Sequence, residues 1–89
     1  MSAFSIQVTY RKGQPFAAYI YLQRKPGQKS ARTERVSDEV LIDYSADGTA
    51  LGIEIVSPGH VSIQEINEAF DRIGLTRPQL EELRPLQAA

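Results

Sequence analysis

The sequence predicts a single α+β domain: an antiparallel β-meander of four to five strands with two C-terminal α-helices packed on one face. Two patterns predict this class. Apolar and polar residues alternate through much of the first 57 residues, which is typical of a sheet with one wet face. After residue 62 the apolar spacing becomes helical. We therefore expect a sheet at about residues 4–57 and helices at about 62–73 and 77–84, in one domain spanning residues 1–89.

The first two predicted strands differ in how their faces are composed. Residues 4–10 alternate between apolar and polar side chains, whereas residues 16–23 are apolar on both faces. Phe16 shares one face of this second strand with the even-numbered apolar residues, and Tyr19 and Tyr21 lie on the other. A strand of this kind is usually covered on both sides. The predicted helices can cover only one face, so we expect the tyrosine face to lack a cover within the chain.

A polar third strand is predicted over residues 32–36 and a further strand over 40–44. The polar composition of the third strand favours an edge position. Residues 37–39 form a bend or a bulge between the two segments, and the sequence leaves open whether 32–44 is one bent strand or two.

An Asp-Gly pair at 47–48 separates two alternating segments, which is the strongest short-range signal for a hairpin. A loop of two or four residues keeps the apolar side chains of both strands on one face. A three-residue loop would place Ile42 opposite Gly52, so an even loop is favoured. With the two-residue loop, the expected pairs are Val40 with Ile55, Ile42 with Ile53, and Tyr44 with Leu51.

The C-terminal part carries clear helix signals. Ser62 and Glu65 have the spacing of a capping box, and Gly74 is a natural residue for the end of that helix. Thr76 is expected to cap the second helix and Pro85 to end it. The residues expected to face the core are Ile63, Ile66, Phe70 and Ile73 in the first helix, and Leu80 and Leu83 in the second.

Charge is distributed unevenly along the chain. Residues 1–35 contain seven lysines and arginines and one acid, a net charge of +6, whereas residues 36–89 contain three arginines and ten acids, a net charge of −7. Two interpretations compete. The basic side chains either occupy solvated loops and pair with the acidic half, or they form one pole on which a charged partner docks.

Composition excludes several classes of site. The chain has no cysteine, which excludes disulfides, thiolate zinc sites and cysteine nucleophiles. No apolar run approaches the roughly 18 residues of a membrane helix, and residues 1–6 lack the basic start and apolar segment of a signal peptide. We therefore expect a soluble cytoplasmic protein with no membrane partner.

Few residues carry the chemistry of an active site. His60 lies in a predicted turn without an acid or a second histidine nearby in sequence. Asp43, Asp47 and Glu54 are candidates for a cation site, but turn geometry and ion pairing explain them more simply. No phosphate loop or nucleophile elbow is present. We expect no catalytic residues, no metal and no cofactor, and therefore no enzyme.

The favoured function is a non-catalytic protein-interaction module that binds itself as a homodimer or pairs with another small protein. A tyrosine-bearing apolar patch rimmed by charge suits an interface. The alternative is an accessory protein that binds nucleic acid through the basic loop 24–35, although the pI near 5.7 is low for that role. The candidate interface residues are Tyr19, Tyr21, Leu41 and Val56, and the candidate polyanion contacts are Arg24, Lys25, Lys29 and Arg32.

Ala18-Tyr19-Ile20 and the segments 43–48 and 52–55 together resemble a small bacterial family of unknown function, DUF2283. Ala18-Tyr19-Ile20 resembles its Leu-Tyr-Ile strand, and residues 43–48 with 52–55 resemble its closing segment, Asp-Tyr-Asp-x-x-Gly-x-x-x-Gly-Ile-Glu-Ile. The likeness covers roughly residues 5–57, but an acidic run of the family is missing around residues 11–17. The resemblance implies a small domain with this kind of fold. Relatives in the family resemble small partner proteins, and no activity is established for the family.

Overall fold

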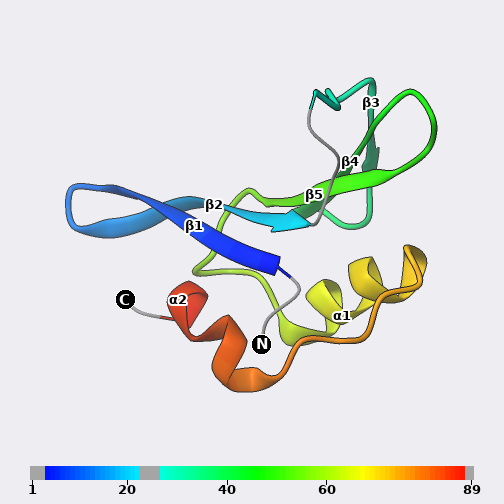
Figure 1. Ribbon diagram of the computed structural model, residues 1–89. Coiled ribbons are helices and arrows are strands. Elements are labelled where there is room, and N and C mark those ends of the chain that lie inside the picture. Colours follow the sequence, from blue (N-terminus) through cyan, green and yellow to red (C-terminus); the bar gives the residue numbers. More distant parts are fainter. Residues whose placement is uncertain (1–3, 23–26, 88–89) are drawn as a thin grey trace.

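Alternating apolar side chains build a five-stranded antiparallel sheet, and the helical segments lie across one of its faces (Figure 1). The structure is a computed structural model and describes residues 4–22 and 27–87. The predicted α+β class and antiparallel sheet are confirmed. The strands are β1 (Phe4–Arg11), β2 (Gln14–Leu22), β3 (Arg32–Arg35), β4 (Val40–Tyr44) and β5 (Ala50–Ile55), and the helical segments are α1 (Ile63–Arg72), the 3-10 turn η1 (Leu80–Leu83) and α2 (Arg84–Gln87).

The order of strands in the sheet is β1-β2-β5-β4-β3. The sheet therefore combines a hairpin, β1–β2, with a three-stranded meander, β3–β4–β5, and the two units join where β2 pairs with β5. This differs from an uninterrupted meander, in which β2 would pair with β3. Apolar β5 occupies the centre and polar β3 the edge, since an edge strand leaves its side chains exposed to water. β3 and β4 are two separate antiparallel strands, which answers the question left open by the sequence.

Two tight turns set the registers of the hairpins. Lys12 and Gly13 both have positive φ, at 53° and 79°, which is typical of the two-residue turn that matches the twist of a hairpin. The β4–β5 turn instead has three residues, 46–48, closed by the Ser45 amide donating to the Thr49 carbonyl at 2.9 Å. The expected even loop is therefore wrong.

A bulge at Leu51 compensates for the odd turn. Tyr44 pairs with Ala50 rather than with Leu51, and the next pair is Asp43 with Gly52. The extra residue restores the predicted register, so Ile42 pairs with Ile53 and Val40 with Ile55, as expected. The physical reason is that one inserted residue moves all following side chains of a strand to the opposite face. The odd turn and the bulge each insert one residue, so their effects cancel.

The core lies between the sheet and the helices. Its fully buried side chains come from β2, β4, β5, α1 and η1, and the ring of Phe70 packs edge-on against Phe4 at 5.4 Å between centroids. The capping box of α1 is present, with the Glu65 amide donating to the Ser62 hydroxyl and the Ser62 amide donating to the Glu65 carboxylate. In the described residues, no helix has the length and apolar character needed to cross a membrane.

The second helical segment departs from the prediction. It begins at Leu80, and its N-cap is Gln79 rather than Thr76, with the Gln79 amide donating to Glu82 at 2.8 Å. Pro85 lies inside α2 instead of ending the helix, because a proline in the first turn gives up no helical hydrogen bond. Leu83 is buried as expected, but Leu80 is 63% exposed, since the short segment turns only one side towards the core.

Candidate interaction surface on the open face of the sheet

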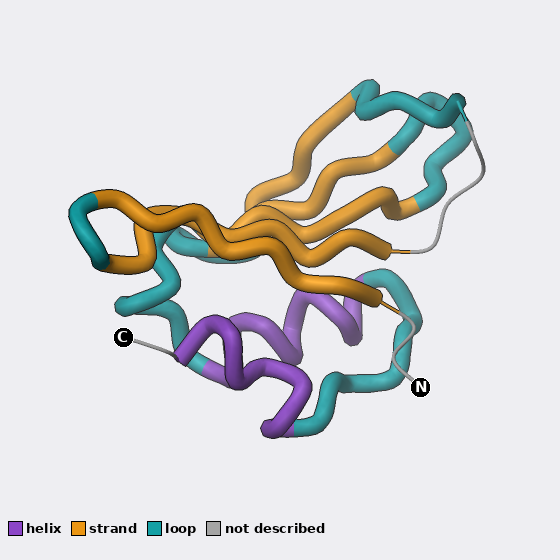
Figure 2. The backbone as a smooth tube through the Cα atoms, turned by 60° about the vertical axis from the view of Figure 1, so that its left-hand side comes forward, coloured by secondary structure: helices purple, strands orange, loops and turns teal. Residues whose placement is uncertain are grey.

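One face of the sheet carries no described helix. Figure 2 shows both helical segments on the same side of the strands, which leaves the opposite side uncovered by the described elements. Strand pairing places every second residue of each strand on this side. We call it the open face, and its central residues are Gln7, Tyr19, Tyr21, Thr33, Arg35, Leu41, Asp43, Gly52 and Glu54.

Tyr19 lies directly over Gly52 at the centre of the open face. A β-carbon added to Gly52 would stand 2.2 Å from the Tyr19 Cε2 atom and 2.3 Å from its hydroxyl oxygen. These distances are shorter than any real carbon contact, so a side chain at position 52 would displace the tyrosine ring. Glycine is therefore required here by the close approach of the ring to the backbone.

Asp43 connects Tyr19 with the outer strand of the sheet. The Tyr19 hydroxyl donates to Asp43 Oδ2 at 2.9 Å, and the Thr33 hydroxyl donates to Asp43 Oδ1 at 2.7 Å. Each oxygen of the carboxylate therefore has a donor from a different strand. The three residues link β2, β4 and β3, with the tyrosine ring passing over β5.

Tyr21 extends the same arrangement to the other edge. Its ring packs on that of Tyr19 with centroids 4.7 Å apart, and its hydroxyl donates to Gln7 Oε1 at 3.0 Å. A continuous series of side-chain contacts thus runs from β1 to β3. Tyr21 remains 38% exposed, so the series is partly accessible to a partner.

The predicted interface residues do not all lie together. Tyr19 and Tyr21 are in contact, and Leu41 lies on the same face, opposite Glu54, which itself pairs with Tyr19. Val56 follows the end of β5 and lines a separate groove. The expectation of an uncovered tyrosine face is met only in part, because Tyr19 is half-buried by its own contacts.

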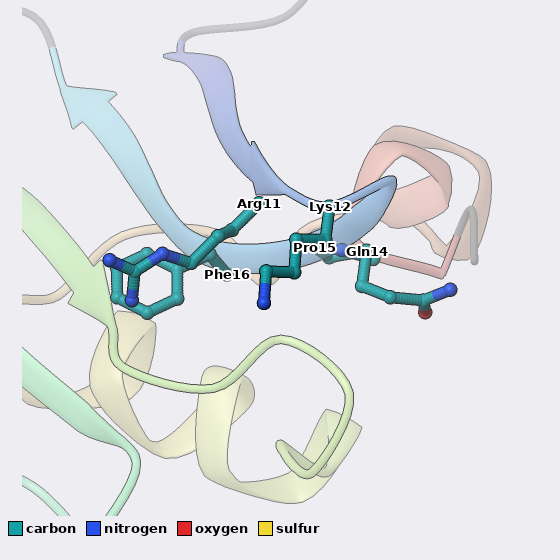
Figure 3. A pocket seen from close by; sticks show the side chains of 5 residues that line it. All are labelled: Arg11, Lys12, Gln14, Pro15 and Phe16. Carbon is teal, nitrogen blue, oxygen red and sulfur yellow. The ribbon is translucent and has the colours of Figure 1, made fainter.

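The groove containing Val56 begins at the tip of the β1–β2 hairpin. A hollow of about 440 Å³ is lined there by residues that include Arg11, Lys12 and Phe16, and the Arg11 guanidinium lies 4.9 Å from the centroid of the Phe16 ring. Figure 3 shows these side chains, with the Arg11 guanidinium next to the Phe16 ring. A neighbouring hollow of about 760 Å³ shares Phe16 and extends to Val56 and the exposed His60. The sequence pattern placed Phe16 with the core-facing residues of its strand. It is 52% exposed, because the register of β1 and β2 shifts beside it.

Two of the three acidic residues considered for a cation site, Asp43 and Asp47, are engaged in structural bonds. Both oxygens of Asp43 accept hydroxyl donors, and Asp47 accepts the Ser45 hydroxyl and, at 3.0 Å, the Thr49 amide. Across residues 4–22 and 27–87, no three histidine or acidic side chains are placed to hold a metal ion. Glu54 is exposed on the open face.

The candidate polyanion contacts are only partly described. Arg24 and Lys25 lie outside the described residues, and Lys29 is exposed in the loop before β3. Arg32 lies 4.1 Å from the centroid of the Tyr44 ring and 3.9 Å from Glu34, so its cation has partners within the chain. Burial, with Glu34 nearby, raises the pKa of Tyr44 above its ordinary value.

Comparison with known proteins agrees with the resemblance at the open face. A family model described as "Protein of unknown function (DUF2283)" matches residues 17–57. No curated protein and no solved structure matches the chain. The matched segment runs from within β2 to just beyond β5, and it contains Tyr19, Asp43 and Gly52, which the fold brings into contact. The resemblance to DUF2283 is confirmed over residues 17–57, which match the model of this family.

Proposed function

We propose that this chain is a non-catalytic protein-interaction module that docks another polypeptide chain on its open face. The observation that carries the proposal is the pair Tyr19 and Tyr21, whose rings are in contact and whose hydroxyls are held by Asp43 and Gln7. Aromatic side chains are enriched at the centres of protein interfaces. Because hydrogen bonds and ring packing already hold these two side chains in place, the side chains would lose little conformational entropy when a partner binds.

The surroundings of the tyrosines fit a small interface. Half-buried Leu41 provides apolar area on the same face. Exposed Glu54 lies between Leu41 and Tyr19 on the central strand β5, and exposed Arg35 lies on the edge strand β3. Interfaces between proteins that also exist separately are about as polar as the rest of the protein surface, so a mixture of tyrosines, leucine and charged side chains is compatible with one. Arg35 donates to the backbone carbonyls of Ser37 and Asp38 at 3.1 Å. These carbonyls hold the guanidinium in place, and because they are uncharged it keeps its positive charge for a partner.

The role of Asp43 supports binding rather than catalysis. A general base must accept a proton from a substrate group within hydrogen-bond reach. Both oxygens of Asp43 already accept hydroxyl donors, one from Tyr19 on β2 and one from Thr33 on β3. Its geometry is that of a residue that orients Tyr19 and Thr33 and stabilises the shape of the open face.

The test is capture of binding proteins from an extract of the source cells with the tagged chain as bait. We expect a stoichiometric protein to be retained by the wild type and lost with Tyr21→Ser. The matched control is Leu80→Ser, which removes a more exposed apolar side chain, 63% against 38%, on η1. Retention by wild type and control, but not by Tyr21→Ser, supports the proposal. Equal retention by all three would place binding elsewhere and reject the open face.

A further inference from the structure

The two edges of the sheet are protected very differently. The β3 edge is four residues long, and Arg32, Glu34 and Arg35 are charged. The β1 edge is eight residues long, and its only charge is Arg11 at the last position. Natural sheets shield their edges with short strands and charges, because the outer backbone groups of an edge strand can pair with another chain. The β1 edge lacks both devices.

The apolar residues of β1 are also incompletely covered. Phe4, Ile6 and Val8 pack against the core, yet each is only partly buried. Their exposure results from their position on the outermost strand, beyond which no described strand lies (Figure 2). A strand added beside β1 would cover this row and continue the sheet.

We propose that a second copy of the chain occupies this edge, with the two β1 strands antiparallel and related by a two-fold axis at Gln7. The result is a continuous sheet of ten strands, five from each copy. This inference rests on the proposed interaction role and names one partner, but it uses the edge of the sheet rather than the open face.

The register follows from matching the two copies of β1. An axis at Gln7 pairs Phe4 with Tyr10, Ser5 with Thr9, and Ile6 with Val8 of the second copy, so like residues meet on each face. Shifting one strand by a single residue would place apolar side chains opposite polar ones. Shifting it by two residues moves the axis to Ile6, which pairs only residues 4–8 of β1, or to Val8, which brings Arg11 into the paired segment. Arg11 lies beyond the paired segment at both ends, so the two arginines are far apart. The strand is therefore self-complementary in polarity and free of like-charge contacts.

Such a dimer would join the two open faces into one surface. Gln7 accepts a hydrogen bond from Tyr21, so the tyrosines of both copies would lie on either side of the axis. Exposed Glu54, on the open face within the family segment, lies two strands away from this edge and would remain accessible for a second partner.

The first experiment is sedimentation equilibrium of the untagged wild type up to high micromolar concentration. We expect a concentration-dependent increase towards twice the monomer mass. Gln7→Lys should remain monomeric, because it places like charges opposite each other at the axis. Gln64→Lys is the matched control, since it makes the same change at an exposed position of α1 and should dimerise like the wild type. Circular dichroism verifies that the variants are folded.

The second experiment tests the register through disulfide formation, which is specific here because the chain has no cysteine. Gln7→Cys should cross-link readily under mild oxidation, since residues directly opposite in antiparallel strands have β-carbons about 4.5–5.5 Å apart. Thr9→Cys, on the same face of the same strand, should not, because Thr9 faces Ser5 of the other copy. A combination of Ser5→Cys and Thr9→Cys should cross-link again.

The outcomes separate the two proposals. A wild type that remains monomeric at all concentrations overturns the edge dimer, as does a Gln7→Lys variant that dimerises like the wild type or cross-linking that is equal for Gln7→Cys and Thr9→Cys. None of these results affects capture of a partner that depends on Tyr21. Conversely, a dimer that dissociates with Gln7→Lys but not with Tyr21→Ser supports the edge even if the open face captures nothing.

Discussion

The ring of Tyr19 lies against the backbone of Gly52, so close that a β-carbon at position 52 would stand 2.2 Å from the ring. The two residues are 33 positions apart in the chain and are brought together by the pairing of β2 with β5. This relationship organises the open face, because the same tyrosine reaches over β5 to Asp43 on β4.

Gly52→Ala is expected to destabilise the fold by about 1–3 kcal/mol, because the added methyl group overpacks the site and displaces Tyr19. Urea unfolding followed by circular dichroism measures the change. Gly59→Ala is the control, since a β-carbon there meets nothing within 4 Å and should leave stability unchanged. In the Tyr19→Ser background, Gly52→Ala should lower the free energy of unfolding by less than it does in the wild type. An equal cost in both backgrounds would show that the ring is not the obstacle.

Tyr19→Phe is expected to lower the free energy of unfolding by about 0.5–1.5 kcal/mol, because Asp43 Oδ2 loses its hydroxyl donor while the aromatic packing is kept. Denaturant titration measures the loss. Tyr10→Phe removes a hydroxyl from a ring that is 52% exposed and should have little effect. If the two variants lost the same stability, the hydrogen bond to Asp43 would have no structural role.

Glu65→Gln is expected to reduce stability at neutral pH by about 0.5–2 kcal/mol, the usual size of a helix-cap effect. The Ser37 hydroxyl, followed by the Ser62 amide, lowers the pKa of the Glu65 carboxyl below its ordinary value. Its contribution is therefore complete above the pKa of the unfolded chain and is lost as the pH falls through the lower folded-state pKa. Urea unfolding at a series of acidic pH values should show a shallower dependence for Glu65→Gln than for the wild type.

The control for this prediction is Glu81→Gln, which removes an exposed carboxylate in η1 that has no part in the capping box of α1. It should keep the wild-type slope at acidic pH. A wild-type slope for Glu65→Gln as well would contradict the assignment of the pH dependence to the cap.

Phe70→Ala is expected to lower the free energy of unfolding by about 3–5 kcal/mol. The substitution empties a fully buried aromatic site between α1 and the sheet and removes the contact with Phe4. This loss is comparable with the whole stability of many small domains, so thermal unfolding should show a large decrease in midpoint or no cooperative transition. Leu80→Ala, at a site 63% exposed, should change the midpoint little. A small effect at Phe70 would mean that α1 does not close the core.

Much of the fold followed from local patterns along the chain. Alternation located the strands, the Asp-Gly pair located a turn, and Ser62 with Glu65 located the start of α1. These signals work because strand and helix periodicity, turn geometry and capping depend on residues that are close in sequence. The two inner β4–β5 pairs were also predictable, because the burial of one face restricts which residues of neighbouring strands can pair.

Other features required the folded chain. The exposure of Phe16 and the bulge at Leu51 arise from irregular pairing that the alternation does not reveal. The late start of the second helical segment reflects its packing, since one short turn has little intrinsic stability.

The sequence by itself determined the class of the fold and the position of most strands and the first helix, and it carries the likeness to DUF2283, expected over roughly residues 5–57 and matched by the family model over 17–57. Only the tertiary structure decided that β2 lies beside β5, and with it the contacts of Tyr19 with Gly52 and Asp43. The physical reason is that strand order depends on which arrangement of the whole sheet buries the apolar residues best. Strand order therefore depends on contacts between segments that are distant in the chain, and local sequence patterns do not determine it.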